Sequence, residues 1–478
     1  MKAAKDQMDE NLFGLKKSDL EQALNLGLSK GGEFSELFVE RRAHTSLLME
    51  DDIIKDTAEN VVLGLGVRVI RDGQTGYAYT SDLSEEAVHA AASTAASVAA
   101  GGAPRKPFPL KETIPVREPD PLRIPSHAAP LEVKIRLVRE TYDAARHFDP
   151  AVNKVKVSLS DCLQNVLIAN SEGLLVEDRR PMLRLGCLVL AEKGGRRESG
   201  FSGGGGRVGL EALSEAMSPA AIAADAAREA ADLLEARDAP AGEMPVVLAA
   251  GHSGVFIHEA VGHLLEADFV RKKTSVFWDK LGRRVGSGEV TIFDDPTLPS
   301  FRGSYRVDDE GTVPSKTPLV EKGVLTGLLQ DRISARILRR PLTGHGRRQD
   351  FTCPPLPRMS NIFVDRGEFD PEDIIRSVKK GLYAERFLGG QVEDSGKFTF
   401  TVSSGRLIEN GRLTRRVKHV TLIGSNLDIL RKMTMVGSDL AFGLPTGTCS
   451  KDGQDVPVTD GCPTLKVSSM TVGGSLED

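Results

Sequence analysis

Two histidines and a glutamate in the segment 258-HEAVGH-263 limit how this part of the chain can fold. In a regular α-helix each residue advances by about 100°, so residues five apart differ in direction by roughly 140°. A regular helix therefore points His258 and His263 away from each other. A π-type turn has i→i+5 hydrogen bonds and brings both residues onto one face. If the two rings act together, the helix must be bulged or broken between them, and Gly262 eases that distortion.

The same segment is typical of a metal-dependent hydrolase. Zinc in proteins takes about four N, S or O ligands, and a catalytic site leaves one position for water. His258 and His263 supply two such ligands, and Glu259, beside the first of them, is placed to act as a general base. The alternative is a chance pairing of two core histidines, which the spacing alone leaves open.

A third protein ligand is required, and the sequence offers several candidates. His252 precedes the helix, and the carboxylates of Glu266 and Asp268 follow it, where they can bind the metal or orient its ligands. Cys449 lies in the polar, glycine-rich segment GLPTGTCSKDGQDVPV, with Lys451 nearby to favour a thiolate. The remaining cysteines are expected in core strands or before prolines: Cys162, Cys187, Cys353 and Cys462. The residues alone leave the choice of third ligand open.

The first half of the chain alternates strand and helix patterns. SELFVERR and NVVLGLGVRVIRDGQTGYAYT contain many β-branched residues and turn glycines, which predicts strands joined by tight turns. Alanine-rich helices are predicted after Ser84 and after Ser218-Pro219, because these residues suit the N-cap and first helical positions. Apolar residues spaced three and four apart from Leu131 to Ala145 predict a further helix with one buried face.

Residues 155–206 are predicted to form a meander of four short strands. The segment runs into GFSGGGGRVG at 200–209, which lacks the GK[ST] ending of a P-loop and the strand–GxGxxG–helix order of a dinucleotide site. We therefore expect a flexible turn there rather than a nucleotide-binding loop. The proline-rich segment 101–126 is expected to be an extended surface connector.

The second half of the sequence has a different pattern of residues. After a linker at 237–245, short apolar runs separated by glycines predict a mostly antiparallel β domain. Its expected helices are the HExxxH-bearing one at about 256–267 and short ones near 331–340 and 371–380. The predicted fold class is α+β. The predicted domains are an N-terminal α/β region at 1–240, with subregions of about 1–125 and 126–240, and a C-terminal, mostly β domain at 241–478 that carries the HExxxH motif.

Composition argues against several classes of function. The 62 Lys and Arg residues nearly cancel the 67 Asp and Glu residues, and no basic run is present, so no nucleic-acid or membrane-surface partner is expected. No stretch reaches about 18 apolar residues, and the N-terminus lacks the apolar core of a signal peptide. Five widely spaced cysteines do not suggest a disulfide framework. We therefore expect a cytoplasmic protein with reduced thiols.

Four segments closely resemble the TldD/PmbA family, and specifically its TldD branch. They are HEAVGHLLEADFVRKKTS, DDEGTVPSKTPLVEKGVLTGLLQDR, GRRQDFTCPPLPRMSN and GTCSKDGQDVPV, in the family's order. The resemblance implies a cytoplasmic zinc metallopeptidase. It makes His258, His263 and Cys449 the metal ligands and Glu259 the catalytic base.

The resemblance also implies substrates and partners. The expected substrates are unfolded or modified peptides, held as an added β-strand. The expected partner is a PmbA/TldE-like subunit, or a second copy of the chain in a homodimer. PmbA-type chains lack the HExxxH motif, so this chain resembles the catalytic partner.

Two positions depart from the family pattern, and three arginines are candidate substrate-binding residues. His345 stands where the family has Asn, and the loop at 391–396 is one residue short, so both are expected to affect cleavage preference. The arginines expected to grip a peptide carboxylate or backbone are Arg347, Arg348 and Arg358.

Two other functions compete with the zinc peptidase. One is a cysteine peptidase in which Cys449 is the nucleophile and a histidine is its base. The other is a non-catalytic peptide-binding or assembly subunit, the PmbA-like role, against which the intact HExxxH motif argues.

Overall fold

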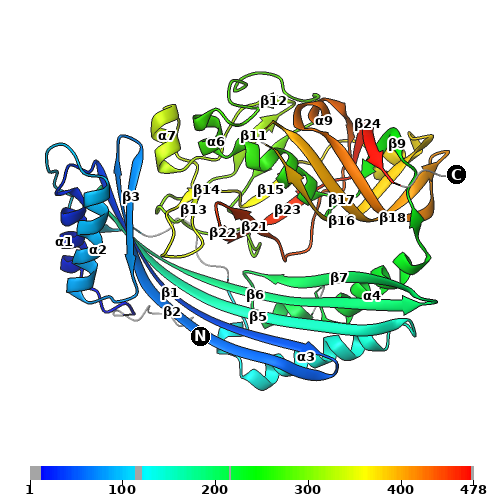
Figure 1. The fold of residues 1–478 in the computed structure, drawn as a ribbon, viewed down its shortest axis with the longest axis horizontal. Helices are drawn as coiled ribbons and strands as arrows, with labels where there is room; N and C mark the ends of the chain where they lie inside the picture. The colour runs from blue at the N-terminus through cyan, green and yellow to red at the C-terminus, as the bar shows by residue number, and fades with distance from the viewer. Residues whose placement is uncertain (1–11, 114–120, 215–216, 394, 475–478) are drawn as a thin grey trace.

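The computed structural model describes residues 12–113, 121–214, 217–393 and 395–474. Figure 1 shows two layers, a sheet of long curved strands from the first half of the chain and a compact second half that lies over it. Helices and strands are mixed throughout, so the predicted α+β class is confirmed. Part of the predicted connector at 101–126, part of the loop at 391–396 and the first eleven residues lie outside the described residues.

The long sheet has the strand order β3-β2-β1-β5-β6, and both β7 and β4 pair with β6. Neighbouring strands are antiparallel except for the short parallel pair of β4 with β6. Strands from either side of residue 125 therefore share one sheet. The strands are β1 (Phe34–Glu50), β2 (Ile53–Arg71), β3 (Gln74–Thr80), β4 (Lys111–Glu112), β5 (Val152–Asn170), β6 (Leu174–Lys193) and β7 (Arg196–Gly206).

The prediction of four short strands and a glycine turn at 155–206 is wrong. β5 and β6 each run unbroken for 19 and 20 residues, because their polar central residues face the second half of the chain rather than forming turns. Gly203–Gly206 are the end of β7 and pair with β6. A Cβ on Gly203 would lie 2.7 Å from Thr446 Cγ2, so glycine there permits close approach of a loop from the second half.

Helices cover the other face of the long sheet. Ser84 and Ser218 cap α2 and α4 with their side chains, as predicted, and the predicted apolar face of α3 packs on the sheet. Alternate residues of β6 such as Leu183, Leu185 and Cys187 point to these helices, so the intervening residues point to the second half. The helices are α1 (Lys17–Leu28), α2 (Glu85–Val98), α3 (Leu131–Arg146) and α4 (Pro219–Glu235).

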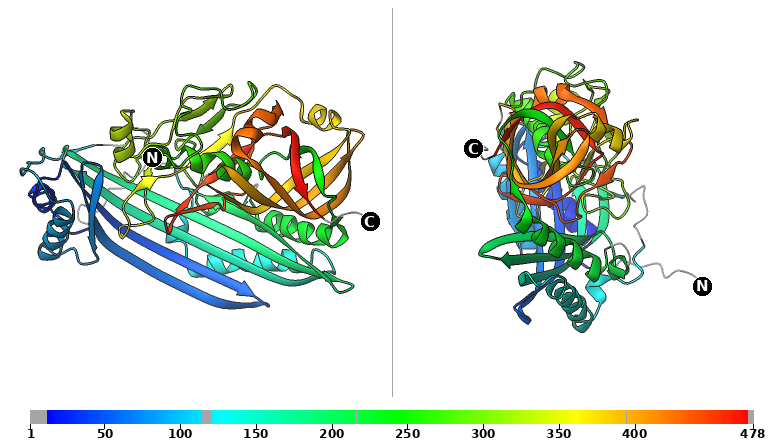
Figure 2. Two further views of the ribbon diagram at one scale, coloured as in Figure 1. Left: turned by 45° about the horizontal axis from the view of Figure 1, so that its top comes forward. Right: turned by 90° about the vertical axis from the view of Figure 1, so that its right-hand side faces the viewer.

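The second half contains a ring of strands. β24, β9, β16, β17 and β18 pair in that order, and a further pairing of β18 with β24 closes the ring, which Figure 2 shows in its right-hand view. Most pairs are antiparallel, as predicted, but β9 with β16 and β8 with β18 are parallel. The strands of this sheet are β8 (Arg237–Asp238), β9 (Gly242–Leu248), β16 (Lys380–Val392), β17 (Lys397–Glu409), β18 (Arg412–Ser425), β19 (Met433–Val436) and β24 (Leu465–Gly473).

A second sheet and a hairpin complete this half. The second sheet has the order β12-β11-β10-β15-β23-β20. Its strands are β10 (Ile292–Asp294), β11 (Thr317–Glu321), β12 (Val324–Leu325), β15 (Asn361–Val364), β20 (Ala441–Phe442) and β23 (Thr459–Cys462). The paired short strands are β13 (Gly346–Arg347) with β14 (Leu356–Pro357), and β21 (Thr448–Lys451) with β22 (Gln454–Pro457). The helices include α6 (Ala267–Lys272), α7 (Arg332–Leu338), α8 (Pro371–Arg376) and α9 (Asn426–Lys432), and α7 and α8 are the two short helices predicted.

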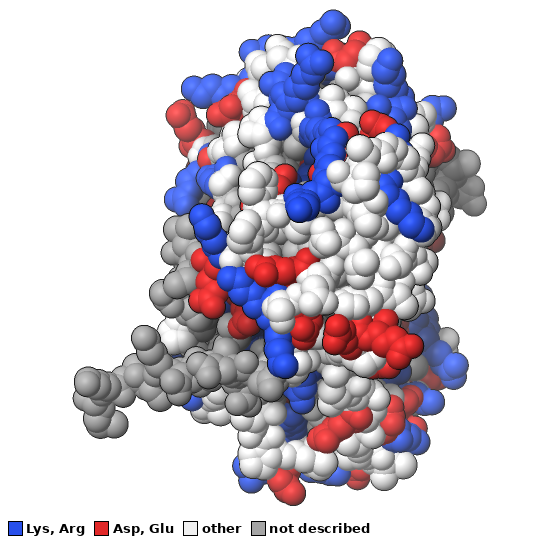
Figure 3. Space-filling model, turned by 90° about the vertical axis from the view of Figure 1, so that its left-hand side faces the viewer, with Lys and Arg blue, Asp and Glu red and all other residues white. Residues whose placement is uncertain are grey.

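The outer surface agrees with the balanced composition. On the face that Figure 3 shows, cationic and anionic side chains are interspersed. Among the described residues, no helix has the length and apolar character needed to cross a bilayer.

We predict that Phe256→Ala lowers the free energy of unfolding by about 3–5 kcal/mol, because it leaves a cavity among packed aromatic rings. Phe256 is fully buried, and its ring lies 4.9 Å from that of Phe400 and 5.2 Å from that of Phe398. Urea denaturation followed by circular dichroism measures the change. The control is Phe108→Ala, whose side chain is 68% exposed, and equal destabilisation by both variants would contradict the prediction.

Candidate metal centre

The HEAVGH segment forms a distorted helix. The short helix α5 (Gly254–Ile257) passes into a π-turn at His258–Gly262, in which the N–H of His263 donates to the carbonyl of His258. The bulge expected from the i+5 spacing is therefore confirmed. A Cβ on Gly262 would overlap Met359 Sδ, so glycine is needed here for packing as well as for the turn. The side chain of buried Asn426 donates to the carbonyl of Ala260, which lies inside the bulge.

Three donor atoms converge beside this turn. One ligand atom each from His258, His263 and Cys449 lies within 4.8 Å of the other two. Cys449 Sγ is 3.4 Å from His263 Nε2, and the two imidazole rings are nearly perpendicular. Cys449 reaches the histidines from β21, where it is only 2% exposed. The segment expected to be a polar loop is thus a hairpin with a buried inner side.

Each histidine is oriented by a carboxylate. Asp460 Oδ1 lies 2.7 Å from His258 Nδ1, and Glu266 Oε2 lies 3.2 Å from His263 Nδ1. With its proton on Nδ1 each ring donates to its carboxylate and leaves the Nε2 lone pair for the cluster, an arrangement common around metal-binding histidines. Glu266 is therefore a partner of His263 rather than a member of the donor cluster.

Lys451 has a different role from the one predicted. Its ammonium does not bind the Cys449 thiol but lies 3.0 Å from Glu266 Oε2 and 2.7 Å from Asp268 Oδ1. The reason is that two buried carboxylates together attract the buried cation more strongly than one sulfur does. Asp268 is therefore the counter-ion of Lys451 and, like His252, lies outside the donor cluster formed by the described residues.

The charges around the cluster favour a thiolate. Burial alone would raise the pKa of Cys449, but the charge and hydrogen bond of His258, together with those of His263, bring it to about 6. Burial likewise opposes the charged form of Glu266, yet Lys451 and His263 hold its pKa at about 2. Two imidazoles and a thiolate with one open side match the donor set that zinc takes in hydrolytic sites. The residues present therefore fit the metal that the sequence implies.

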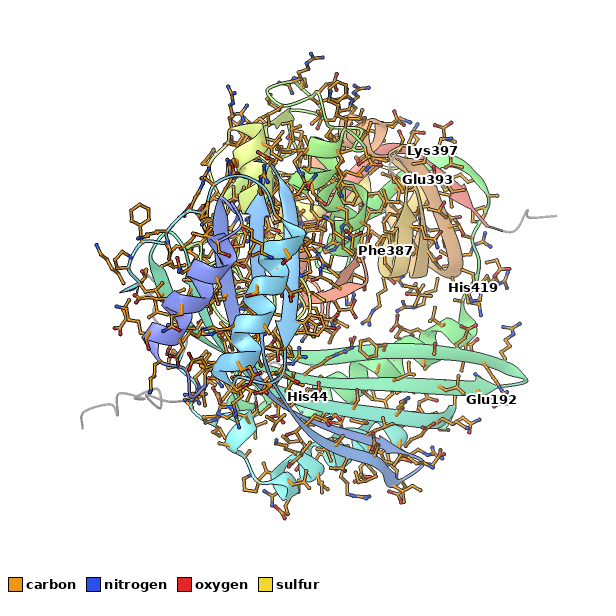
Figure 4. All side chains as sticks on the ribbon, turned by 60° about the vertical axis from the view of Figure 1, so that its left-hand side comes forward. His44, Glu192, Phe387, Glu393, Lys397 and His419 are labelled. Carbon is orange, nitrogen blue, oxygen red and sulfur yellow. The ribbon has the colours of Figure 1, made fainter. Side chains whose placement is uncertain are left out.

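Glu259 lies on the open side of the cluster. Its Oε2 is 3.7 Å from His263 Nε2, and its side chain is 29% exposed, compared with 3% for His258. A cavity of about 370 Å³ adjoins the site and is lined by Asp460, His252 and Phe387 among others. Figure 4 shows Phe387 on the side of the second half that faces the long sheet. The carboxylate of Glu259 is thus accessible, whereas His258 is enclosed.

The arginines expected to bind substrate occupy three different settings. Arg358 is fully buried behind the hairpin and donates to the carbonyls of Cys449 and Gln454 at 2.5 and 3.1 Å, so it positions the cysteine. Arg348 pairs with Glu36 of the long sheet and holds the two halves together. Arg347 donates to the carbonyls of Met359 and Pro457 and also lines a large cavity.

The structure also places His345 and shows what the sequence did not. His345 is fully buried and bonded to Asp294 at 3.0 Å and to Thr343 at 2.9 Å, so it does not line a cleft. Asp460 was not predicted, because a lone Asp in VTDG is typical of a turn. It could have been sought as the carboxylate that a metal-binding histidine usually needs at its other ring nitrogen.

Comparisons with known proteins cover most of the chain. The chain matches three domains of the PmbA/TldA metallopeptidases: domain 1 over residues 35–99, the central domain over 124–234 and the C-terminal domain over 241–474. It is 39% identical over 450 residues to the "Metalloprotease TldD homolog" of Haemophilus influenzae, covering 93% of each chain. This chain belongs to the PmbA/TldD family.

Other relatives of this PmbA/TldD chain carry similar names. The "Zinc metalloprotease TldD homolog" of Saccharolobus solfataricus is 32% identical over 235 residues, which is 49% of this chain and 52% of that protein. The crystal structure of TldE from Thermococcus kodakarensis has the same fold, with a TM-score of 0.77, 20% identity and coverage of 95% of this chain and all of that one. The family is thus one of metallopeptidases, and the fold that this chain shares with TldE covers 95% of it.

Proposed function

We propose that this PmbA/TldD protein is a zinc metallopeptidase in which His258, His263 and Cys449 hold the metal and Glu259 is the general base. The observation that carries the proposal is the convergence of three donor atoms within 4.8 Å of one another. Two of them, from His258 and His263, lie at the ends of a π-turn that brings both imidazoles to one side. The name of the Saccharolobus relative supports zinc as the metal.

The chain's own side chains account for most of the proposed mechanism. Zinc, when bound, supplies a Lewis acid that polarises the peptide carbonyl and acidifies water. Glu259 takes the proton from the attacking water and delivers it to the leaving amine. Asp460 and Glu266 keep both histidines in the tautomer that presents Nε2. Arg358 fixes the backbone of Cys449, so the thiolate keeps its place during turnover.

The proposed substrates are unfolded or modified peptides, and the proposed partner is a TldE-like subunit or a second copy of the chain. The shared fold of TldE supports such a partner, because similar chains pair readily through similar surfaces. A peptide held as an added strand is recognised mainly through its main chain, which suits unfolded substrates.

The proposal predicts that chelation abolishes peptide cleavage and that added zinc restores it. Cleavage of unfolded casein by the purified protein, together with its partner where one is required, measures both steps. The control is the same treatment with a chelator already saturated with zinc. Full activity in excess free chelator, with metal removal verified by mass spectrometry, would contradict the proposed function.

A cysteine peptidase is the second candidate, and the 3.4 Å contact between Cys449 Sγ and His263 Nε2 favours it. A cysteine nucleophile needs such a histidine base. The same thiol is only 2% exposed and faces a second imidazole, which suits a ligand better than a nucleophile. The chelation experiment separates the two, because a cysteine peptidase keeps its activity without metal.

We predict that Asp460→Asn weakens zinc affinity by about 10- to 100-fold, because the variant loses the carboxylate that orients and polarises His258. Competition with a chromophoric zinc chelator measures the affinity. Asp452→Asn, at the exposed tip of the hairpin between β21 and β22, is the matched control. Equal affinities of the two variants would show that Asp460 does not support the metal site.

A further inference from the structure

A second cavity, of about 570 Å³, lies between the long sheet and the second half of the chain. Asp455 and Pro457 of β22 line it, whereas Cys449 of β21 pairs with Val456, whose side chain points to the other face of the hairpin. The cavity and the metal cluster therefore lie on opposite faces of one hairpin. A cavity of this size is in the range of small-ligand sites.

Arginines without carboxylate partners line this cavity. Arg302 donates to the carbonyl of Gly447 at 2.8 Å, and Arg347 to the carbonyls of Met359 and Pro457, but neither forms an ion pair with a described residue. Arg207 has a buried Nε with no hydrogen-bond partner among the described residues, and no ion pair with any of them. Three guanidinium groups of this cavity thus form no ion pair with a carboxylate of the described residues.

The carboxylates in the same cavity mostly have partners other than these three arginines. Asp161 pairs with Lys134 at 2.6 Å, and Asp309 pairs with Arg180 at 2.5 Å. Burial raises the pKa of Asp308 well above its usual value, and its oxygens accept hydrogen bonds from the backbone N–H groups of Glu310, Thr312 and Gly346 rather than from an arginine. The remaining carboxylate, Asp455, is exposed and accepts a hydrogen bond from Ser450. The cavity therefore has an excess of positive charge.

The pKa values of two of the arginines are consistent with this excess of positive charge. Burial, and then the charge of Arg180, lower the pKa of Arg207 to about 9. Burial, and then the charges of Arg184 and Arg347, lower the pKa of Arg302 to about 10. Guanidinium groups held close together without counter-ions are stabilised by a bound anion, and a carboxylate suits their paired donors.

The sheet connects this cavity with the one beside the metal cluster. Alternate residues of β6 share the face toward the second half: Arg180 and Met182 line the arginine cavity, and Leu188 lines the cavity beside Asp460. Arg184 lies between them on that face, and its buried Nε has no partner among the described residues. Figure 4 shows His44 of β1, which also lines the arginine cavity, on the same sheet.

We propose that the cavity lined by Arg207, Arg302 and Arg347 binds a carboxylate of the peptide substrate while the bond to be cut lies at the metal cluster. The carboxylate is either the C-terminus of the peptide or an acidic side chain. The identity of this ligand rests on the proposed peptidase function. Because Arg302 and Arg347 also hold Gly447 and Pro457, the bound carboxylate lies against the hairpin that carries Cys449.

Peptide binding to the metal-loaded E259Q protein tests the proposal without turnover. The probe is a short uncharged peptide labelled at its N-terminus, prepared as the free acid, as the C-terminal amide, and as an amide with one internal Glu. Fluorescence anisotropy is expected to show about 10- to 100-fold weaker binding of the uncharged amide than of the free acid, since hydrogen bonds to charged groups are strong. Tight binding of the Glu-containing amide identifies a side-chain carboxylate as an accepted source.

Arginine variants locate the site. R207Q in the E259Q protein is expected to bind the free acid as weakly as the amide, because Arg207 contacts no part of the hairpin through a hydrogen bond. R283Q, at an arginine 69% exposed beside Asp279, is the matched control and is expected to change nothing. If R207Q does not fold, the comparison of acid and amide in the protein with all arginines intact decides the question. Equal binding of all three peptides, or an unchanged preference for the acid in folded R207Q, would overturn the proposal.

Failure of this inference and failure of the proposed function give different results. Cleavage by the wild-type protein with the same KM for acid and amide would refute the carboxylate site and leave the peptidase. Carboxylate-dependent binding without any cleavage would refute the peptidase and leave the site.

Discussion

Replacing Glu259 with Gln is expected to lower kcat for peptide cleavage by about 10²- to 10⁴-fold, the usual contribution of a general base. The amide keeps the size of the side chain but cannot take a proton from water. The carboxylate is not one of the three converging donors, so zinc content is expected to remain at the wild-type level. Mass spectrometry of the metal and steady-state kinetics on the same preparation measure both quantities.

Glu321→Gln is the control, because this exposed glutamate lies on β11, outside the metal cluster. The two variants are expected to have equal zinc content and very different kcat. An E259Q protein that retains zinc and cleaves at the wild-type rate would disprove the assignment of the base. Loss of zinc from E259Q would instead make Glu259 a ligand.

Replacing Cys449 with Ala is expected to remove nearly all bound zinc and, with it, peptide cleavage. The thiolate is one of only three converging donors in the described part of the chain, and two imidazoles alone form a weak zinc site. Metal content after dialysis against a weak chelator measures the loss, and circular dichroism verifies the fold.

Cys353→Ala is the matched control, since Cys353 is a partly buried free cysteine outside the cluster. Wild-type zinc content in the Cys449 variant would mean that another side chain supplies the third metal ligand. Glu266 would be the first to test, because it already contacts His263. The zinc content of Cys449→Ser is expected to lie between those of the wild type and Cys449→Ala, since a hydroxyl is a poorer zinc ligand than a thiolate.

Local features of the fold were predictable, whereas strand lengths were not. Ser84 and Ser218 mark helix starts because the capping hydrogen bond involves residues three apart. β5 looked like two strands because its central polar residues resemble a turn in sequence. In the structure these residues, such as Ser160 and Gln164, face a polar cavity made by the second half, which no local pattern reveals.

In the candidate site, too, the local geometry was predictable from the sequence, whereas contacts between distant residues were not. The π-turn follows from the spacing of His258 and His263, because helix geometry excludes the alternative. Cys449 as a ligand rested on family resemblance, and the structure brings it to the histidines from 186 residues away. Lys451 was assigned to the wrong partner because two buried carboxylates compete for it, and sequence gives no measure of that competition.

The separation of His263 and Cys449 has a consequence for synthesis of the protein. At about 5–20 residues per second, the ribosome needs roughly 10–40 s to add the 186 residues between them. During that interval the emerging chain carries the histidines without the thiolate. β9 also cannot pair with β24 during that interval, because β24 follows the β21–β22 hairpin in the sequence. The donor cluster therefore cannot assemble on a half-made chain, and under the proposed function the site for peptide cleavage forms only when synthesis of the chain is nearly complete.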